Sequence, residues 1–478
     1  MDLPYEFIAK MEKLLGKDAK DFFEALDEPS QKAITANFNR LEKSKFEKSC
    51  DFEISPIPLV DNGYYATIPK FSQNIFNHLG VIYSQEPSAM YPVEILGVSP
   101  NDWVLDVCAS PGGKSIQILE KLKNTGLLVS NEIVFGRAKI LEENLTRMGF
   151  ENSVITCNTP CELGQSGLLF DKIIVDAPCG GEGMIRKNNF DINFYNPSSI
   201  DSNAQRQLDI LENVEGLLRE GGTLVYSTCT YDPRENEEVI SKFLDAHPNY
   251  QVLDSSKYLK IADAGLRVSK HPLELSLRRY PHRFRGEGQF MVALTKTTAT
   301  NAESKSTKQT TCKNYTKVTQ KEADIINSTL KNVLPKQNWE YLKKGDGIYI
   351  IPSQKLNLSS LNVISIGVHL GTVQKNILKL AHEFYHTFGC MFFNQLELDE
   401  ISALKYLHGD ELDIDKPNGI FAVNYLGTPL GGGKIAQGKL KNYYKKELRI
   451  WKEYYENTTY YTQGRSRRYK PSNLSQDD

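Results

Sequence analysis

Short apolar runs alternate with stretches of helical periodicity between residues 86 and 297, and this alternation restricts the chain to few folds. It predicts an α/β fold, a doubly wound sheet with helices on both faces. Six runs are expected to form strands, at residues 103–107, 127–130, 153–157, 172–175, 223–226 and 289–294. Open α/β sheets bind ligands beyond the carboxyl ends of their strands, so the residues after each run are the first candidates for function.

The chain has 478 residues, which is too long for a single hydrophobic core. A small α+β domain is expected before the central sheet, and a further α/β pattern follows it. Between the central sheet and this further α/β pattern, a segment rich in Thr, Ser, Lys and Asn predicts a linker. The predicted boundaries are 1–85 for the N-terminal domain, 86–297 for the central domain, 298–316 for the linker, 317–397 and 398–460 for two C-terminal domains, and 461–478 for a basic, unstructured tail.

Composition limits the classes of protein to consider. No apolar run reaches 18 residues and the N-terminus lacks the features of a signal peptide, so we expect a cytoplasmic protein whose eight cysteines stay reduced. The net charge of -2 argues against a general polyanion binder. However, eleven Lys and Arg stand against three acids between Lys434 and Lys470, interleaved with Tyr and Trp. This segment predicts contacts with phosphates and unpaired bases, although a solvated helix with a disordered tail has the same composition.

Two cysteines follow neighbouring strand-like runs in matching positions. Cys179 lies in Asp176–Gly183, and Cys229 lies in Ser227–Tyr231. In one parallel sheet both thiols would lie at its carboxyl edge, near an acidic residue, which favours covalent chemistry. Two alternatives remain open. A single cysteine after a strand is most often a small buried hydrophobe, and further thiols at residues 157 and 161 allow a metal site, although no Cys-x-x-Cys pair occurs.

A glycine-containing loop, residues 106–115, follows the first predicted strand and leads into a helix. Glycines allow close approach of the backbone to a ligand, and the helix N-terminus offers free N–H groups. The loop is not a phosphate-binding loop, because Cys108 stands where that motif has glycine, and Gly-x-Gly-x-x-Gly is absent. Glu132 follows the next strand, where a carboxylate can bind both hydroxyls of a ribose. A ribose without phosphates points to S-adenosylmethionine as the cofactor.

Five segments resemble, in order and spacing, the motifs of the Nop/Sun family of RNA cytosine-5 methyltransferases. They are Gln85–Met90, Cys108–Lys114, Asp176–Gly183, Ser227–Thr230, and Arg279–His282 together with Gly286–Phe290. Three C-terminal segments look like the bacterial RsmF type, which methylates small-subunit ribosomal RNA: His408–Asp410, Leu426–Lys434 and Gly438–Asn442. The resemblance implies a Rossmann-like S-adenosylmethionine-dependent methyltransferase core, an N-terminal α+β RNA-recognition domain over 1–85 and a PUA-like RNA-binding domain over 398–460.

The same resemblance implies the roles of individual residues. Cys229 would add to carbon 6 of cytosine, and Cys179 would permit release. Asp176 is suited by its own chemistry to hydrogen-bond the base. Arg186 and Lys187 are expected either to hold a backbone phosphate or to form an exposed pair. Asn158 stands where the family usually has Asp, and its amide can still hydrogen-bond adenine. The expected cofactor-binding residues are Cys108, Ala109, Ser110, Pro111, Gly112, Gly113, Lys114, Glu132, Arg137, Asn158 and Asp176.

The sequence therefore predicts a monomeric enzyme, without a membrane partner or metal, that forms 5-methylcytosine in RNA. Small-subunit ribosomal RNA is the expected substrate, and transfer RNA is the alternative. Two other classes stay open. His382-Glu383-Phe384-Tyr385-His386 matches the zinc protease pattern, with His408, Glu397 or Asp399 as a third ligand. A non-catalytic RNA-binding protein that kept a methyltransferase fold is the other.

Overall fold

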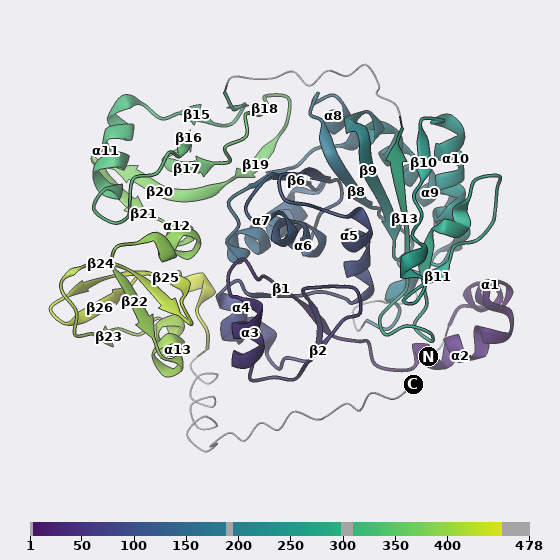
Figure 1. The fold of residues 1–478 in the computed structure, drawn as a ribbon, viewed down its shortest axis with the longest axis horizontal. Coiled ribbons are helices and arrows are strands. Elements are labelled where there is room, and N and C mark those ends of the chain that lie inside the picture. Colours follow the sequence, from purple (N-terminus) through teal and green to yellow (C-terminus); the bar gives the residue numbers. More distant parts are fainter. Residues whose placement is uncertain (1–2, 188–194, 298–308, 452–478) are drawn as a thin grey trace.

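The structure, a computed structural model, describes residues 3–187, 195–297 and 309–451 (Figure 1). Its largest sheet has the strand order β11-β12-β13-β9-β8-β5-β6-β7-β19, with β10 paired to β13. The five strands from β7 to β9 are parallel, whereas β13 is antiparallel to β9. The strands are β5 (Trp103–Asp106), β6 (Leu127–Asn131), β7 (Ser153–Thr156), β8 (Phe170–Asp176), β9 (Leu218–Thr228), β10 (Tyr250–Val252), β11 (Asp263–Ala264), β12 (Leu277–Arg279), β13 (Gln289–Lys296) and β19 (Val363–Ile366).

All six predicted strands of the central domain are confirmed, and β8 and β9 extend beyond the predicted runs. The helices that connect these strands cover both faces of the sheet, as a doubly wound fold requires (Figure 1). They are α5 (Tyr91–Leu96), α6 (Gly113–Leu122), α7 (Phe135–Met148), α8 (Pro160–Gly164), α9 (Ile200–Val214) and α10 (Glu237–Ala246).

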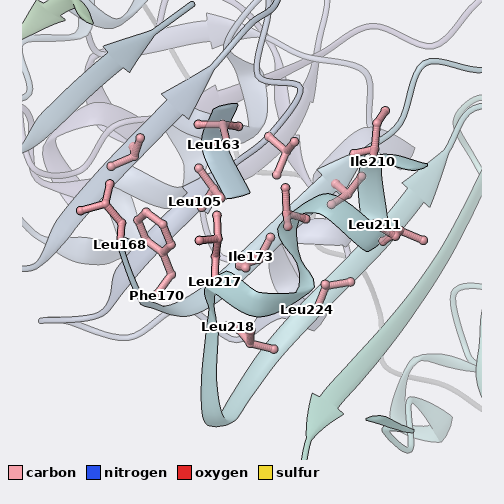
Figure 2. Packing of buried hydrophobic residues seen from close by; sticks show 14 of the residues in the cluster. Leu105, Leu163, Leu168, Phe170, Ile173, Ile210, Leu211, Leu217, Leu218 and Leu224 are labelled. Atoms are coloured by element: carbon pink, nitrogen blue, oxygen red, sulfur yellow. The ribbon is translucent and has the colours of Figure 1, made fainter. Parts of the chain in front are cut away.

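The core between β8, β9 and the covering helices is made mostly of aliphatic side chains, with Phe170 among them, as Figure 2 shows. Ile173 of β8 and Leu224 of β9 are fully buried, as is Leu211 of α9. Burying a side chain of this size contributes about 1.5 to 3 kcal/mol. This packing fixes the two strands whose carboxyl ends carry the candidate cysteines.

The N-terminal residues form a small α+β unit, as expected. Its antiparallel sheet has the order β2-β3-β1-β4. One hydrophobic cluster contains residues of this unit and of the far C-terminal region, including Phe46, Phe76, Leu404 and Leu430. The N-terminal unit and the last described region therefore share a core. The elements are α1 (Tyr5–Leu15), α2 (Ala19–Leu26), β1 (Ala33–Ala36), α3 (Lys43–Ser49), β2 (Ile54–Pro56), β3 (Gly63–Ala66), α4 (Ile75–His78) and β4 (Ile82–Ser84).

The region after the central domain adds a five-stranded antiparallel sheet, β15-β16-β17-β20-β21. Residues 298–308 of the predicted linker lie outside the described residues, and its remainder contains short strands. The apolar run at residues 362–366 belongs to the further α/β pattern and forms a strand, but this strand pairs with β7 and extends the central sheet. The elements are β14 (Thr311–Cys312), β15 (Thr316–Lys317), α11 (Gln320–Leu330), β16 (Glu340–Lys344), β17 (Gly347–Ile351), β18 (Asn357–Leu358), β20 (Val368–Gln374), β21 (Ile377–Leu380) and α12 (His382–Phe388).

The last described region is a five-stranded sheet with the order β22-β24-β25-β26-β23, which lies beside the N-terminal sheet in Figure 1. The predicted tail, 461–478, and residues 452–460 lie outside the described residues. In the part of the chain that the structure describes, no helix is long and apolar enough to span a membrane. The elements are β22 (Gln395–Leu398), α13 (Glu400–His408), β23 (Leu412–Asp413), β24 (Gly419–Tyr425), β25 (Thr428–Ala436) and β26 (Lys439–Asn442).

Truncating a leucine of the central core should destabilise the fold. Leu211→Ala removes a fully buried side chain and leaves a cavity, so we expect a loss of about 2 to 5 kcal/mol. Urea unfolding followed by circular dichroism measures this loss. Leu259→Ala is the matched control, because Leu259 is 45% exposed and its truncation should change stability little. Equal losses in the two variants would contradict the described core.

Candidate active site

The two candidate cysteines lie side by side at the carboxyl ends of β8 and β9. These strands pair in parallel, with Asp176 opposite Ser227, so the loops that follow them begin at the same level of the sheet. The sulfur atoms of Cys179 and Cys229 are 3.3 Å apart. Both residues are partly exposed. The structure therefore brings together two thiols that are 50 residues apart in the chain.

The thiols differ in their surroundings. The hydrogen bond between Cys179 and Cys229, together with burial, raises the pKa of Cys179 well above its ordinary value. A thiol of this kind holds its proton firmly and is a poor nucleophile at neutral pH. Cys108 in the glycine loop is also unsuited to nucleophilic attack, because burial raises its pKa. The backbone of Cys229 is held in place, because Gly183 N–H donates to the carbonyl of Cys229 at 2.7 Å.

Asp176 accepts hydrogen bonds at both oxygens. Lys114 donates to Oδ2 at 2.7 Å and Ser227 donates to Oδ1 at 2.6 Å, with Gln289 at 3.4 Å. Burial by itself would lower the pKa of Lys114, but the nearby negative groups, Asp176 first and then Asp106, together outweigh burial and raise that pKa. Lys114 is therefore a fixed cation. The pair places one positive and one negative side chain beside the thiols, in a partly dehydrated setting where charges act strongly.

The glycine loop connects β5 to the N-terminus of α6. Gly112 has a φ of 118°, which favours glycine. A Cβ atom on Gly113 would lie 3.1 Å from Gln85, so the loop packs tightly against the N-terminal unit. Beneath it, Asp106 is fully buried and accepts a hydrogen bond from Ser115 at 2.7 Å. Burial raises the pKa of Asp106 to about 7, and its Oδ1 has no partner among the described residues.

The residues after β6 have features that suit a nucleoside. The carboxylate of Glu132 lies 3.4 Å from Arg137, which also donates to the carbonyl of Ser110 at 3.0 Å. Arg137 thus connects the glycine loop to Glu132. Next to the carboxylate, Ile133, Val134 and Phe135 are about half exposed, which is unusual for three consecutive apolar residues. Sequence reasoning missed this apolar surface, although an apolar run directly after the acidic residue was its visible sign.

Asn158 lies near this region, but its amide already has protein partners. Its Oδ1 accepts from Asn362 N–H at 3.1 Å and its Nδ2 donates to Glu162 at 3.2 Å. Asn362 directly precedes β19, so Asn158 helps to attach the C-terminal region to the central sheet. The predicted contact of this amide with adenine stays a prediction.

Two predictions about basic and aromatic residues are wrong. Arg186 is buried, with its guanidinium bonded to Glu287 at 2.9 Å and to the carbonyl of Ala25 at 3.2 Å, so it neither holds a phosphate nor lies in an exposed pair. The aromatic residues between Lys434 and Lys470 are predicted to contact unpaired bases, but Tyr444, one of them, is also buried and lies 2.8 Å from His78. In both cases a residue type suited to RNA binding serves as a contact between domains.

The zinc-protease pattern lies on α12, with the rings of His382 and His386 5.6 Å apart. His386 is buried, and its Nε2 lies 3.1 Å from the guanidinium of Arg40. Glu383 pairs with Lys445. The third-ligand candidates also have partners: His408 with Asp410, Asp399 with Ser402, and Glu397 with Gly427. Among the described residues no group of three His, Cys, Asp or Glu could hold a metal ion, and α12 packs between domains.

The raised pKa of Asp106 predicts a pH dependence of stability. The folded state holds this proton up to about pH 7, whereas the unfolded chain releases it near 3.8, so the stabilisation is full at low pH and is lost as pH rises through 7. Asp106→Asn cannot titrate. Between pH 5 and pH 8 the unmodified protein should therefore lose about 2 to 3 kcal/mol more than this variant.

Urea unfolding at several pH values measures that difference. Asp209→Asn, at an exposed position of α9, is the control and should follow the unmodified protein. Parallel pH profiles for Asp106→Asn and the unmodified protein would show that the carboxyl is not protonated in the folded state.

Comparisons with known proteins agree with this fold. Residues 93–295 match the family model of the 16S rRNA methyltransferase RsmB/F, residues 3–87 match the N-terminal domain of 16S rRNA methyltransferase RsmF, and residues 393–450 match the methyltransferase RsmF PUA domain. Ribosomal RNA small subunit methyltransferase F of Psychromonas ingrahamii is 30% identical over 480 residues, which cover 93% of this chain and 97% of the relative.

Two solved structures have similar folds. A methyltransferase homologue from Pyrococcus horikoshii is 28% identical and has a TM-score of 0.54, with 61% of this chain and 94% of that chain covered. NSun6 from the same organism is 21% identical at a TM-score of 0.54, over 62% of this chain and 98% of that chain. The predicted Rossmann-like core with an N-terminal domain and a PUA-like region is thus confirmed. The chain belongs to the family of ribosomal RNA small subunit methyltransferase F.

Proposed function

We propose that this protein methylates carbon 5 of cytosine in small-subunit ribosomal RNA, with S-adenosylmethionine as the methyl donor. The observation that carries the proposal is the pair of thiols 3.3 Å apart, beside the Lys114–Asp176 ion pair. Membership of the ribosomal RNA small subunit methyltransferase F family supports the substrate class. Transfer RNA is the alternative substrate.

Carbon 5 of cytosine is a weak nucleophile, and its activation is the first task of the site. In the proposed mechanism the Cys229 thiolate adds to carbon 6, and the electrons of the carbon 5–carbon 6 double bond become available at carbon 5. Asp176 hydrogen-bonds the edge of the base, and Lys114 balances the negative charge that collects there. A stacked base is out of reach, so the cytosine must be flipped or unpaired.

Cys179 is suited to the release step. A methylated adduct carries a proton on carbon 5 that must leave before the enzyme is freed. Cys179 would first lose its own proton to water, so that a small fraction is present as thiolate. This thiolate would take the carbon 5 proton, the C–H electrons would re-form the double bond, and the bond between carbon 6 and Cys229 would break to return a thiolate. The raised pKa of Cys179, caused by its hydrogen bond to Cys229 and by burial, makes its thiolate a good proton acceptor.

The residues around the glycine loop fit the cofactor in chemical terms. Residues 108–114 offer backbone groups at the start of α6, Glu132 offers a carboxylate for the ribose, and the apolar surface after it suits a flat base. When bound, S-adenosylmethionine supplies an electrophilic methyl group. Arg137 holds the loop and Glu132 in place, and Asp176 would contact both the cofactor and the cytosine.

Substitution of the cysteines tests the mechanism. Cys229→Ala should abolish transfer of labelled methyl groups to RNA, because no other described thiol lies in its position. Cys179→Ala should methylate once and then accumulate a covalent protein–RNA adduct, since the carbon 5 proton is retained. Denaturing gel electrophoresis with labelled RNA detects the adduct. Cys161→Ala, at an exposed cysteine of α8, is the control and should turn over normally. Full activity of Cys229→Ala would contradict the mechanism.

The PUA-like sheet has a basic face that suits RNA. Lys434 of β25 lies directly opposite Lys441 of β26, and both are exposed. Like charges in register destabilise a strand pair, unless an anion is bound between them. Trp451 follows this sheet with 62% of its surface exposed, which offers a ring for base stacking. We therefore propose this face as an RNA-binding surface of the protein.

Removing both lysines should weaken RNA binding without unfolding the sheet. The double variant Lys434→Ala/Lys441→Ala should bind RNA more weakly, and the slope of log K against log salt should become shallower by about 1.5. Fluorescence anisotropy at several salt concentrations measures both quantities. Lys331→Ala, an exposed lysine next to α11, is the control. An unchanged slope in the double variant would show that RNA does not bind to this face.

A further inference from the structure

The loop that carries Cys179 is held from beneath by two buried side chains. Gln207 of α9 donates through Nε2 to the carbonyl of Pro178 at 3.0 Å and to Glu235 at 2.8 Å. Glu235 also accepts the N–H of Gly180 at 3.1 Å. The peptide groups on both sides of Cys179 are thus bonded to a single pair of side chains.

Gly180 shows how closely this pair approaches the loop. A Cβ atom at this position would lie 3.0 Å from Oε1 of Glu235, closer than nearly all Cβ contacts in proteins. A larger residue would push the loop away from the carboxyl group. The absence of a side chain at Gly180 therefore lets Glu235 hold the backbone next to Cys179.

The residue after Glu235 holds the other cysteine loop in the same way. Asn236 accepts a hydrogen bond from the hydroxyl of Thr228 at 2.6 Å and donates to the carbonyl of Thr230 at 3.0 Å. It thus bonds to the residues before and after Cys229. Tyr226 of β9 fixes the main chain between Glu235 and Asn236, because its hydroxyl donates to the carbonyl of Glu235 at 2.6 Å.

The side chains of Gln207, Glu235 and Asn236 are fully buried. Burial is costly for a carboxyl group such as that of Glu235. Burial raises the pKa of Glu235 to about 7, and its Oε1 has no partner among the described residues. Apolar side chains of similar volume would stabilise the fold at lower cost. Packing alone therefore does not account for a linked Gln, Glu and Asn beneath the two thiols.

We propose that Gln207, Glu235 and Asn236 form a clamp that fixes the spacing of Cys179 and Cys229 and thereby sets the rate at which the enzyme leaves its methylated product. This role rests on the proposed function. The clamp residues are positioning residues, since they hold the loops on either side of the thiols. With the clamp loosened, Cys179 would drift from the adduct, and removal of the carbon 5 proton would slow while addition of Cys229 to carbon 6 continued.

The spacing can be measured without RNA or cofactor. Diamide oxidises two neighbouring thiols to a disulfide and takes up the two protons and two electrons, and peptide mass spectrometry quantifies the Cys179–Cys229 bond. Gln207→Ala and Glu235→Ala should form it at least ten times more slowly than the unmodified protein. Glu235→Gln keeps an oxygen for the N–H of Gly180 and for Gln207, so it should stay within twofold. Gln205→Ala, at an exposed position of α9, is the matched control.

The release step is measured on small-subunit ribosomal RNA transcribed in vitro, with labelled S-adenosylmethionine. Gln207→Ala and Glu235→Ala should form the covalent adduct at the normal rate, accumulate it as Cys179→Ala does, and turn over at least tenfold more slowly. Glu235→Gln should restore turnover. A purely structural role would instead lower adduct formation and turnover together, in proportion to the folded fraction. If Glu235→Ala does not fold, Gln207→Ala carries both measurements.

Disulfide rates in Gln207→Ala equal to those of the unmodified protein would overturn the clamp, whatever RNA is methylated. Slower disulfide formation with normal release would overturn its role in release. If the unmodified protein makes no 5-methylcytosine and Cys179→Ala makes no adduct, the proposed function fails and the role in release falls with it. The disulfide rates then still support or overturn the spacing role, so the two failures are distinguishable.

Discussion

The parallel pairing of β8 with β9 is the constraint on which the rest of the site depends. Its register sets Asp176 opposite Ser227, so two loops from distant parts of the chain leave the sheet at the same level. A strand advances about 3.3 Å per residue. If β9 shifted by two residues along β8, the Cys229 loop would move by more than the 3.3 Å that now separates the two sulfur atoms. The buried leucines around Ile173 and Leu224 maintain this register from below (Figure 2).

The domains around this sheet form a closely connected body. The N-terminal unit and the PUA-like sheet share one hydrophobic cluster, and β19 attaches the intervening region to β7. At their junction, the guanidinium of Arg40 donates to the carbonyls of Leu79, His386 and Pro429. A basic face on the PUA-like sheet is therefore held at a fixed position relative to the thiols, which suits the recognition of one folded RNA.

Much of the central domain could be predicted from sequence, because short apolar runs and a loop of small residues encode strands and a helix start locally. The partner of β19 could not be predicted, because an apolar strand does not specify which sheet edge it joins. The same limit applies to Arg186 and Tyr444, whose residue types suit both RNA and a buried contact between domains. Gln207, Glu235 and Asn236 carry no motif that sequence reasoning used, and only their bonds to the cysteine loops reveal them.

The identity of the methylated atom tests the account most directly. Small-subunit ribosomal RNA can be incubated with the unmodified protein and isotopically labelled S-adenosylmethionine, digested to nucleosides and analysed by mass spectrometry against authentic standards. The account predicts that the label appears in 5-methylcytidine. Label in a cytidine methylated on its amino group or ribose, or in another nucleoside, would contradict it, because those reactions need no thiol addition to carbon 6.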